Sequence, residues 1–219
     1  MKKNVLGAIT LAAMMTFAAC GGSQQAPAAT QASAAAETVA EAAAEAAGEA
    51  AGALKEIEAG SCETPAVLTS IGQSADVDIV NTLCSKAGIE IEKNNNITAD
   101  DLPADCKTLV LAVGGSSKGL GAAGIDADQE LARTAALLEK AKSQGTKIVA
   151  VHTGGAARRG TLSDSFINPA FEAADIGVIV SEGDQDGLMQ GILAKNGAAG
   201  ACVSTVADCV AVMTTLFGK

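Results

Sequence analysis

The sequence contains no tryptophan or tyrosine, and it has only four phenylalanines and one histidine among 219 residues. Any core must therefore be built mainly from aliphatic side chains. Basic residues are also few, with 15 lysines and arginines against 25 aspartates and glutamates, which gives a net charge of −10. Because a nucleic-acid-binding surface normally needs a basic face, we expect no nucleic-acid partner.

Several catalytic and nucleotide-binding motifs are also missing. No Gly-Lys-Ser/Thr follows a glycine loop. A Gly-x-Gly-x-x-Gly match at residues 119–124 begins five residues past the expected strand and leads into Ile125 and Asp126 rather than a helix. A similar glycine pattern occurs in short-chain dehydrogenases, but their catalytic tyrosine is absent. We therefore expect no cofactor. No Cys-x-x-Cys or Cys/His cluster occurs, and we expect no metal site.

The N-terminus has the pattern of a targeting segment. Lys2 and Lys3 precede an apolar run at residues 5–19, which is too short to span a bilayer as a helix. The sequence Phe-Ala-Ala-Cys-Gly at 17–21 resembles a bacterial lipobox, which implies cleavage before Cys20 and lipidation of that cysteine. We expect a signal peptide at 1–19 and a protein anchored on the extracytoplasmic face of the membrane. Ordinary signal-peptide cleavage is the alternative.

Residues 20–60 are predicted to form a tether or stalk. A Gln/Ala/Ser/Pro segment is followed by glutamates at every fourth position among alanines, a spacing that puts them along one side of a helix. There is no apolar stripe for a partner helix, so a spacer is favoured over a coiled coil. The globular domain is expected at 61–219.

Five cysteines lie outside the predicted anchor, and an odd number cannot all pair within one chain. They are Cys62, Cys84, Cys106, Cys202 and Cys209. Cys84 falls on an apolar helix face and Cys202 in an apolar strand, so both are expected to be small core residues.

Short apolar runs alternate with amphipathic helical patterns throughout the domain. The predicted strands are 66–71, 89–92, 109–113, 147–152, 176–180 and 200–204. Such alternation indicates an α/β fold with a mostly parallel sheet of five to six strands and helices on both faces. We predict a single doubly wound, flavodoxin-like domain. Ser74, Ser163, Thr205 and Asp126 (or Asp128) are expected to cap helices, and Gly145 to end one.

Polar, glycine-rich segments follow four of these strands. Parallel strands end at the same edge of a sheet, where open α/β sheets bind ligands. The longest such segment runs from Gly114 to Gly121 and contains Lys118; its backbone amides could form a nest for an anion. The candidate ligand-binding residues are Gly72, Gln73, Ser74, Gly114, Gly115, Ser116, Ser117, Lys118, Gly119, Gly121, His152, Gly154, Gly155, Arg158 and Arg159.

Each charged candidate also has a structural interpretation. Lys118 could contact an anion or be a solvated lysine. Adjacent arginines rarely aim at one point, so one of Arg158 and Arg159 is expected to bind ligand and the other to pair with Asp164 or Glu182.

His152 could transfer protons or simply be buried at the sheet edge. Asp184 and Asp186 could bind a ligand hydroxyl or a cation, although a solvated acidic loop is favoured.

Three segments together resemble the signature blocks of an uncharacterised bacterial family with a domain of unknown function. They are GQSAD at 72–76, GGSSKGLGAAGID at 114–126 and HTGGAARRGTLSD at 152–164. The resemblance implies a flavodoxin-like domain in exported or lipid-anchored proteins. It implies no established activity.

Three functions are compatible with these observations. The first is a binding module for a small anionic metabolite of the carboxylate or phosphate class, which could serve a membrane permease or a sensor. The second is a hydrolase or transferase with His152 as base, Asp164 as orienting acid, and Ser116, Ser117 or Ser163 as nucleophile. The third is a non-catalytic interaction domain on a stalk.

Overall fold

The computed structural model describes residues 54–219, and its centre is a six-stranded sheet in the order β2-β1-β3-β4-β5-β6. The strands are β1 (Ala66–Ile71), β2 (Glu92–Lys93), β3 (Thr108–Val113), β4 (Lys147–His152), β5 (Ile176–Val180) and β6 (Ala199–Val203). Every neighbouring pair is parallel. The predicted signal peptide, Cys20 and most of the predicted stalk lie outside the described residues. Among the described helices, none is long and apolar enough to cross a membrane.

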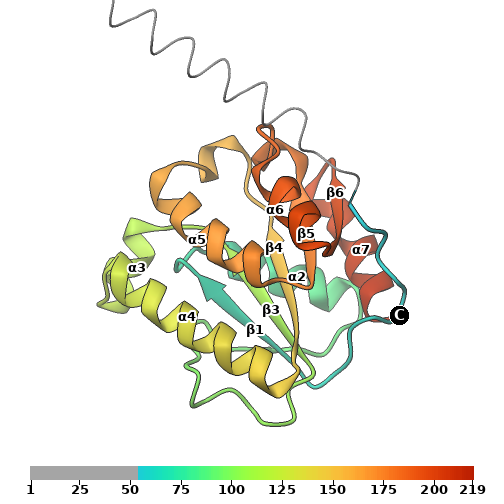
Figure 1. The fold of residues 1–219 in the computed structure, drawn as a ribbon, viewed down its shortest axis with the longest axis horizontal. Helices are drawn as coiled ribbons and strands as arrows, with labels where there is room; N and C mark the ends of the chain where they lie inside the picture. Colours follow the sequence, from blue (N-terminus) through green and yellow to red (C-terminus); the bar gives the residue numbers. More distant parts are fainter. Residues whose placement is uncertain (1–53) are drawn as a thin grey trace, which may run out of the picture. The chain divides into compact units, whose positions relative to one another are not determined.

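Helices cover both faces of this sheet, as Figure 1 shows. They are α2 (Asp76–Lys86), α3 (Ser117–Ala123), α4 (Ala127–Gln144), α5 (Thr161–Ala173), α6 (Leu188–Asn196) and α7 (Cys209–Leu216). In Figure 1, α4, α5 and α6 lie in front of the sheet, and α2 and α7 lie behind it. The strand order is that of flavodoxin-like folds, which confirms the predicted class. The chain reverses its direction of winding between β1 and β3.

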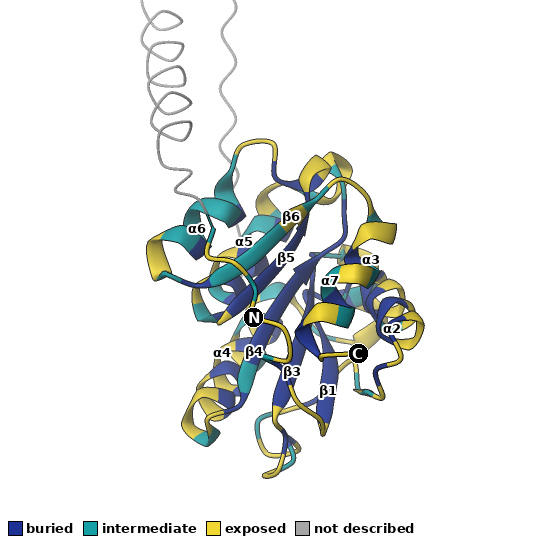
Figure 2. Ribbon diagram, turned by 90° about the vertical axis from the view of Figure 1, so that its right-hand side faces the viewer, coloured by how far each residue is buried: buried dark blue, intermediate teal, exposed yellow. Residues whose placement is uncertain are grey.

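Two apolar clusters hold the layers together, one on each face of the sheet. Side chains of β1 alternate between them, so that Val67 and Ile71 pack on one side and Leu68 on the other. Because both faces are covered, all six residues of β1 and of β3 are buried (Figure 2). This explains why these strands are continuous apolar runs rather than alternating patterns.

Most predicted helix boundaries are confirmed. Asp126 begins α4 with a capping box, in which its carboxylate accepts from Gln129 N at 2.8 Å, and Gly145 ends the helix in the left-handed conformation. Thr205 forms a second capping box with Asp208. The N-cap of α2 is Ala75 rather than the predicted Ser74, although Ser74 Oγ accepts from Asp76 N at 3.2 Å. The expectation that Ser163 caps a helix was wrong, because Ser163 lies inside α5, which begins after Gly160.

Four other expectations were wrong in detail. The second strand is Glu92–Lys93 rather than 89–92. The glycine-rich segment after β3 contains a helix, α3, because Ser116 caps it by accepting from Gly119 N and Leu120 is buried beneath it. On α4, the apolar spacing predicts one face made of Leu131, Ala135, Leu138 and Ala141, but Ala135 is exposed and Glu130 is buried. Cys202 is exposed, since β6 is an edge strand.

Candidate functional site

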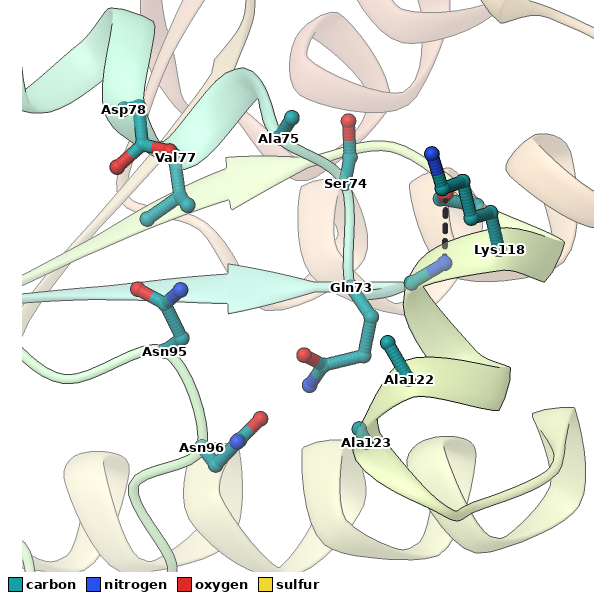
Figure 3. A pocket seen from close by; sticks show the side chains of 12 residues that line it. Gln73, Ser74, Ala75, Val77, Asp78, Asn95, Asn96, Lys118, Ala122 and Ala123 are labelled. Carbon is teal, nitrogen blue, oxygen red and sulfur yellow. Dashed lines mark hydrogen bonds between the residues drawn. The ribbon is translucent and has the colours of Figure 1, made fainter.

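An open cleft of about 490 Å³ lies where the strand order reverses, at the carboxyl ends of β1 and β3. The ends are level, because Ile71 pairs with Val113 in the β1–β3 register. The cleft is lined by Gln73, Ser74, Ala75, Val77, Asp78, Asn95, Asn96, Ser116, Lys118, Gly119, Ala122 and Ala123. In Figure 3 the Gln73 amide projects between the asparagines on one side and α3 on the other. Crevices at such reversals are the usual ligand sites of open α/β sheets.

The wall of the cleft formed by the β1 loop is held from behind by two charged residues of α4. Glu130, fully buried, accepts from Gly72 N at 2.9 Å and from Gln73 Nε2 at 3.2 Å. Arg133 donates to Glu130 at 2.7 and 2.8 Å, to Ser70 O at 2.6 Å, and to Ile97 O at 2.8 Å. We call Glu130 and Arg133 the α4 clamp. The clamp ties the β1 loop to the segment that carries the cleft asparagines.

The cleft contains one lysine whose charge is not neutralised by a neighbour. Within residues 54–219, no carboxylate lies within ion-pair distance of Lys118. The acidic residue of the lining, Asp78, is paired with Lys93 at 2.6 Å. The fixed charge that the cleft offers to a ligand is therefore positive.

Four amides of the glycine-rich segment are not available for the predicted amide nest. Gly114 N donates to Ile71 O, Ser116 N to Gly72 O, Gly115 N to Ser163 Oγ, and Gly119 N to Ser116 Oγ, all between 2.9 and 3.2 Å. Anion binding in the cleft would therefore depend on the Lys118 side chain and on the amides that remain at the start of α3.

Close packing explains most of the predicted ligand-binding glycines. A Cβ atom at Gly72 would lie 2.7 Å from the Phe166 ring, and one at Gly115 would lie 2.9 Å from the backbone of Ser163. A Cβ at Gly119 would overlap the Gln73 carbonyl oxygen.

After β4, a Cβ at Gly154 would strike Arg158, and one at Gly155 would lie 2.7 Å from the Glu182 carboxyl carbon. Gly121 differs, because nothing lies within 4 Å of its built Cβ.

The two adjacent arginines have different surroundings, and Arg159 makes the predicted structural ion pair. Arg159 pairs with Asp164 at 2.8 Å and with Asp186 at 2.9 Å, and it also donates to Gly183 O at 2.8 Å. The guanidinium holds the pKa of Asp186 below its ordinary value. Asp164 is thus the correct partner and Glu182 is not. Arg159 is a structural residue that links the loops after β4 and β5.

Arg158 is the arginine that remains accessible. Its side chain is 45% exposed, and its NH2 lies 3.6 Å from Oδ1 of the buried Asp76. The Oδ2 atom of Asp76 is buried without a hydrogen-bond partner in the described chain. Asp76 was not singled out as a site residue, although it closes the GQSAD block.

The loop after β5 is less solvated than expected. Asp184 is buried, and its carboxylate accepts from Met189 N at 2.8 Å and Gln190 N at 3.1 Å. It therefore holds the start of α6 in place rather than facing a ligand. Asp186 is engaged by Arg159.

The predicted catalytic arrangement around His152 is not assembled. His152 is fully buried, and its Nδ1 lies 2.9 Å from Val113 O, so this nitrogen carries the proton and donates. Asp164 cannot orient His152, because it is committed to Arg159. Ser163 Oγ accepts from Gly115 N. The orienting group of His152 is a backbone carbonyl instead of an acid.

His152 is expected to make the protein sensitive to acid. Burial is the main cause that lowers the pKa of His152 from the ordinary value near 6.5. The hydrogen bond to Val113 O and the charges of Asp76 and Asp184 oppose this shift, and Arg159 adds to it. Below about pH 6.5 the unfolded chain binds a proton that the native state refuses, so stability falls as pH falls, by at most about 1.4 kcal/mol per pH unit. Urea unfolding at several pH values between neutral and moderately acidic should show a shallower decline for His152→Gln than for the wild type. Parallel profiles would contradict this role.

The predicted residues thus divide into two groups rather than forming one site. The cleft group is Gln73, Ser74, Ser116, Lys118 and Gly119. Gly72, Gly114 and Gly115 pack beneath it, and Ser117 and Gly121 lie on exposed parts of α3 outside its lining. The second group, His152, Gly154, Gly155, Arg158 and Arg159, follows β4 and contributes nothing to the cleft lining. Neither arginine therefore lines the cleft that contains Lys118.

Three buried cysteines offer no reactive centre in the described chain. All five are free, and burial is the largest effect that raises the pKa of Cys62, Cys84 and Cys209 to about 11. Thiols of this kind are unreactive at neutral pH. Among residues 54–219 no group of three or more histidine, cysteine or acidic side chains could hold a metal ion.

The fold and cleft define a flavodoxin-like, doubly wound α/β protein. Residues 63–217 match the family described as "Domain of unknown function (DUF6305)", and the chain belongs to this family. The predicted membership of an uncharacterised family is thereby confirmed. Comparison with curated proteins finds no match. Among solved structures, "Crystal Structure of TesA" is similar at 14% identity and a TM-score of 0.28, covering 62% of this chain and 76% of that one.

Proposed function

We propose that this protein is a binding module for a small anion of the carboxylate or phosphate class. The observation that carries the proposal is Lys118, a lysine with no ion-pair partner among the described residues, in an open cleft at the strand reversal. A lysine ammonium is a point charge with three donors, which suits either anion. Ser74 and Ser116 add hydroxyl groups to the same lining.

The setting that we propose for this module is the extracytoplasmic face of the membrane. The lipobox-like sequence ending at Cys20 and the alanine- and glutamate-rich segment that follows it support this location. Anchored there, the domain would present its ligand to a permease or a sensor.

The interaction-domain alternative has less support. Among the described residues, Ile79 is the one large apolar side chain classed as exposed, at 39%. A docking surface for another protein would normally have a contiguous apolar patch.

Lys118→Gln is expected to weaken anion binding at least about tenfold, because it removes the charge while keeping a polar side chain only one atom shorter. The measurement is isothermal titration of the purified full-length chain with succinate, malate, inorganic phosphate and glycerol 3-phosphate. The matched control is Lys140→Gln, which neutralises an exposed lysine of α4 that lies outside the cleft.

Equal affinities of wild type and Lys118→Gln for every anion that binds would overturn the assignment of the site. Absence of binding by all four compounds would overturn the proposed function.

A further inference from the structure

The orientation of the Gln73 amide is fixed by the residues behind it. Its Nε2 lies 3.2 Å from both carboxylate oxygens of Glu130. The other neighbours of those oxygens are Gly72 N and the guanidinium of Arg133, all of which are N–H donors. A carboxylate surrounded in this way can only accept, so the NH2 end of the amide must face it. The Gln73 oxygen, Oε1, must therefore point the other way.

The backbone of Gln73 helps to hold this orientation. Gln73 has φ of +58° and is the non-glycine residue with positive φ in the described chain. Such a conformation costs about 1–2 kcal/mol for a residue with a Cβ. Its carbonyl is pressed against Gly119 of α3, and the Gln73–Gly115 bridge joins the two loops. The side chain is thus presented from a strained and firmly packed position, which is typical of functional sites.

The free oxygen of the amide is an acceptor available in the cleft. Within residues 54–219, Gln73 Oε1 accepts no hydrogen bond, and the side chain is only partly buried. Gln73 and Lys118 line the same cleft. A ligand that spans the cleft therefore meets a cation at one place and a fixed, neutral acceptor at another.

We propose that the ligand is a hydroxylated anion, a hydroxy-carboxylate or a hydroxyalkyl phosphate, and that Gln73 is its specificity-determining residue. This inference rests on the proposed function: Lys118 binds the anionic group, and Gln73 Oε1 accepts a hydrogen bond from the hydroxyl. A hydroxyl fits better than an ammonium, because the one carboxylate of the lining, Asp78, is already neutralised by Lys93.

The test compares two pairs of probes that differ by hydroxyl groups: malate with succinate, and glycerol 3-phosphate with n-propyl phosphate. Isothermal titration of the full-length wild-type chain should show about tenfold tighter binding of the hydroxylated member of at least one pair, the usual contribution of one hydrogen bond in a partly exposed site. Gln73→Met keeps the side-chain length but has no such acceptor. It should lose the preference for the hydroxylated member, whereas Lys118→Gln should weaken both members equally and keep the preference.

Each outcome separates this inference from the proposed function. If the wild type binds both members of each pair equally well, the hydroxyl inference fails while anion binding stands. A preference that survives in a folded Gln73→Met chain, checked by its melting temperature, would remove Gln73 from the explanation. If neither these four probes nor inorganic phosphate binds, the proposed function and this inference fail together.

Discussion

Glu130→Leu should lower the free energy of unfolding by about 3–5 kcal/mol, because it leaves the Arg133 guanidinium buried without its counter-charge. Glu130 is fully buried, and only 12% of the Arg133 side chain is exposed. The same change leaves the Gly72 amide without its hydrogen-bond acceptor, because this amide donates to Glu130. Urea unfolding of the full-length chain, followed by circular dichroism, measures the loss.

Two further variants distinguish the clamp from a general effect on α4. Glu139→Leu makes the same substitution at an exposed position of the helix and should change stability by less than about 0.5 kcal/mol. The double variant Glu130→Leu/Arg133→Leu removes both charges, and it should recover part of the loss, since an apolar pair often replaces a buried ion pair without cost. A loss in Glu130→Leu no larger than that in Glu139→Leu would show that the clamp does not hold the β1 loop.

The sheet could be predicted from the sequence because its strands are buried on both faces. An apolar run such as Ile176–Val180 leaves no room for a solvated side chain, so the limits of β5 coincide with those of the run. The observed strands β1, β4 and β5 match their predicted limits. β2 was misplaced because it has only two residues, both exposed, and so leaves no hydrophobic pattern.

The candidate site was predicted only in part, because several interactions depend on packing between distant elements. In the sequence, Glu130 has the appearance of a surface residue of an amphipathic helix. The structure shows that the β1 loop packs against it and buries it. The one signal in the sequence was its spacing from Thr134, Leu137 and Ala141, which are all buried on the same face of α4. The roles of Arg158 and Arg159 likewise followed from which carboxylates each could reach.

The segment after β3 shows how glycine can mislead. Five glycines within residues 114–124 indicated a loop with free amides. Instead, two of them permit close packing: the Cβ of an alanine at Gly115 or Gly119 would collide with neighbouring backbone. Glycine supplies the same freedom for ligand approach and for contact between two loops. Composition alone does not separate these uses.

The variants Gly119→Ala and Gly121→Ala separate these two uses of glycine by experiment. They make the same change two residues apart in α3, and we expect opposite changes in the free energy of unfolding. The Cβ at position 119 overlaps the Gln73 carbonyl oxygen, a backbone atom held by the clamp beneath it, whereas nothing lies within 4 Å of the Cβ at position 121. We expect Gly119→Ala to destabilise the protein by about 1–3 kcal/mol through overpacking. We expect Gly121→Ala to stabilise it by up to about 1 kcal/mol through helix propensity.

Both effects would appear in the urea midpoint, and the binding measurements extend the comparison to the cleft. Moving α3 away from the β1 loop displaces Lys118 from Gln73, so Gly119→Ala should also weaken anion binding, and Gly121→Ala should not. If the two variants had equal stability, the contact between Gln73 and Gly119 would be soft enough to relax. The cleft would then lack the rigid wall on which discrimination by Gln73 depends, because an amide that can move aside gives little preference for a hydroxyl over a hydrogen.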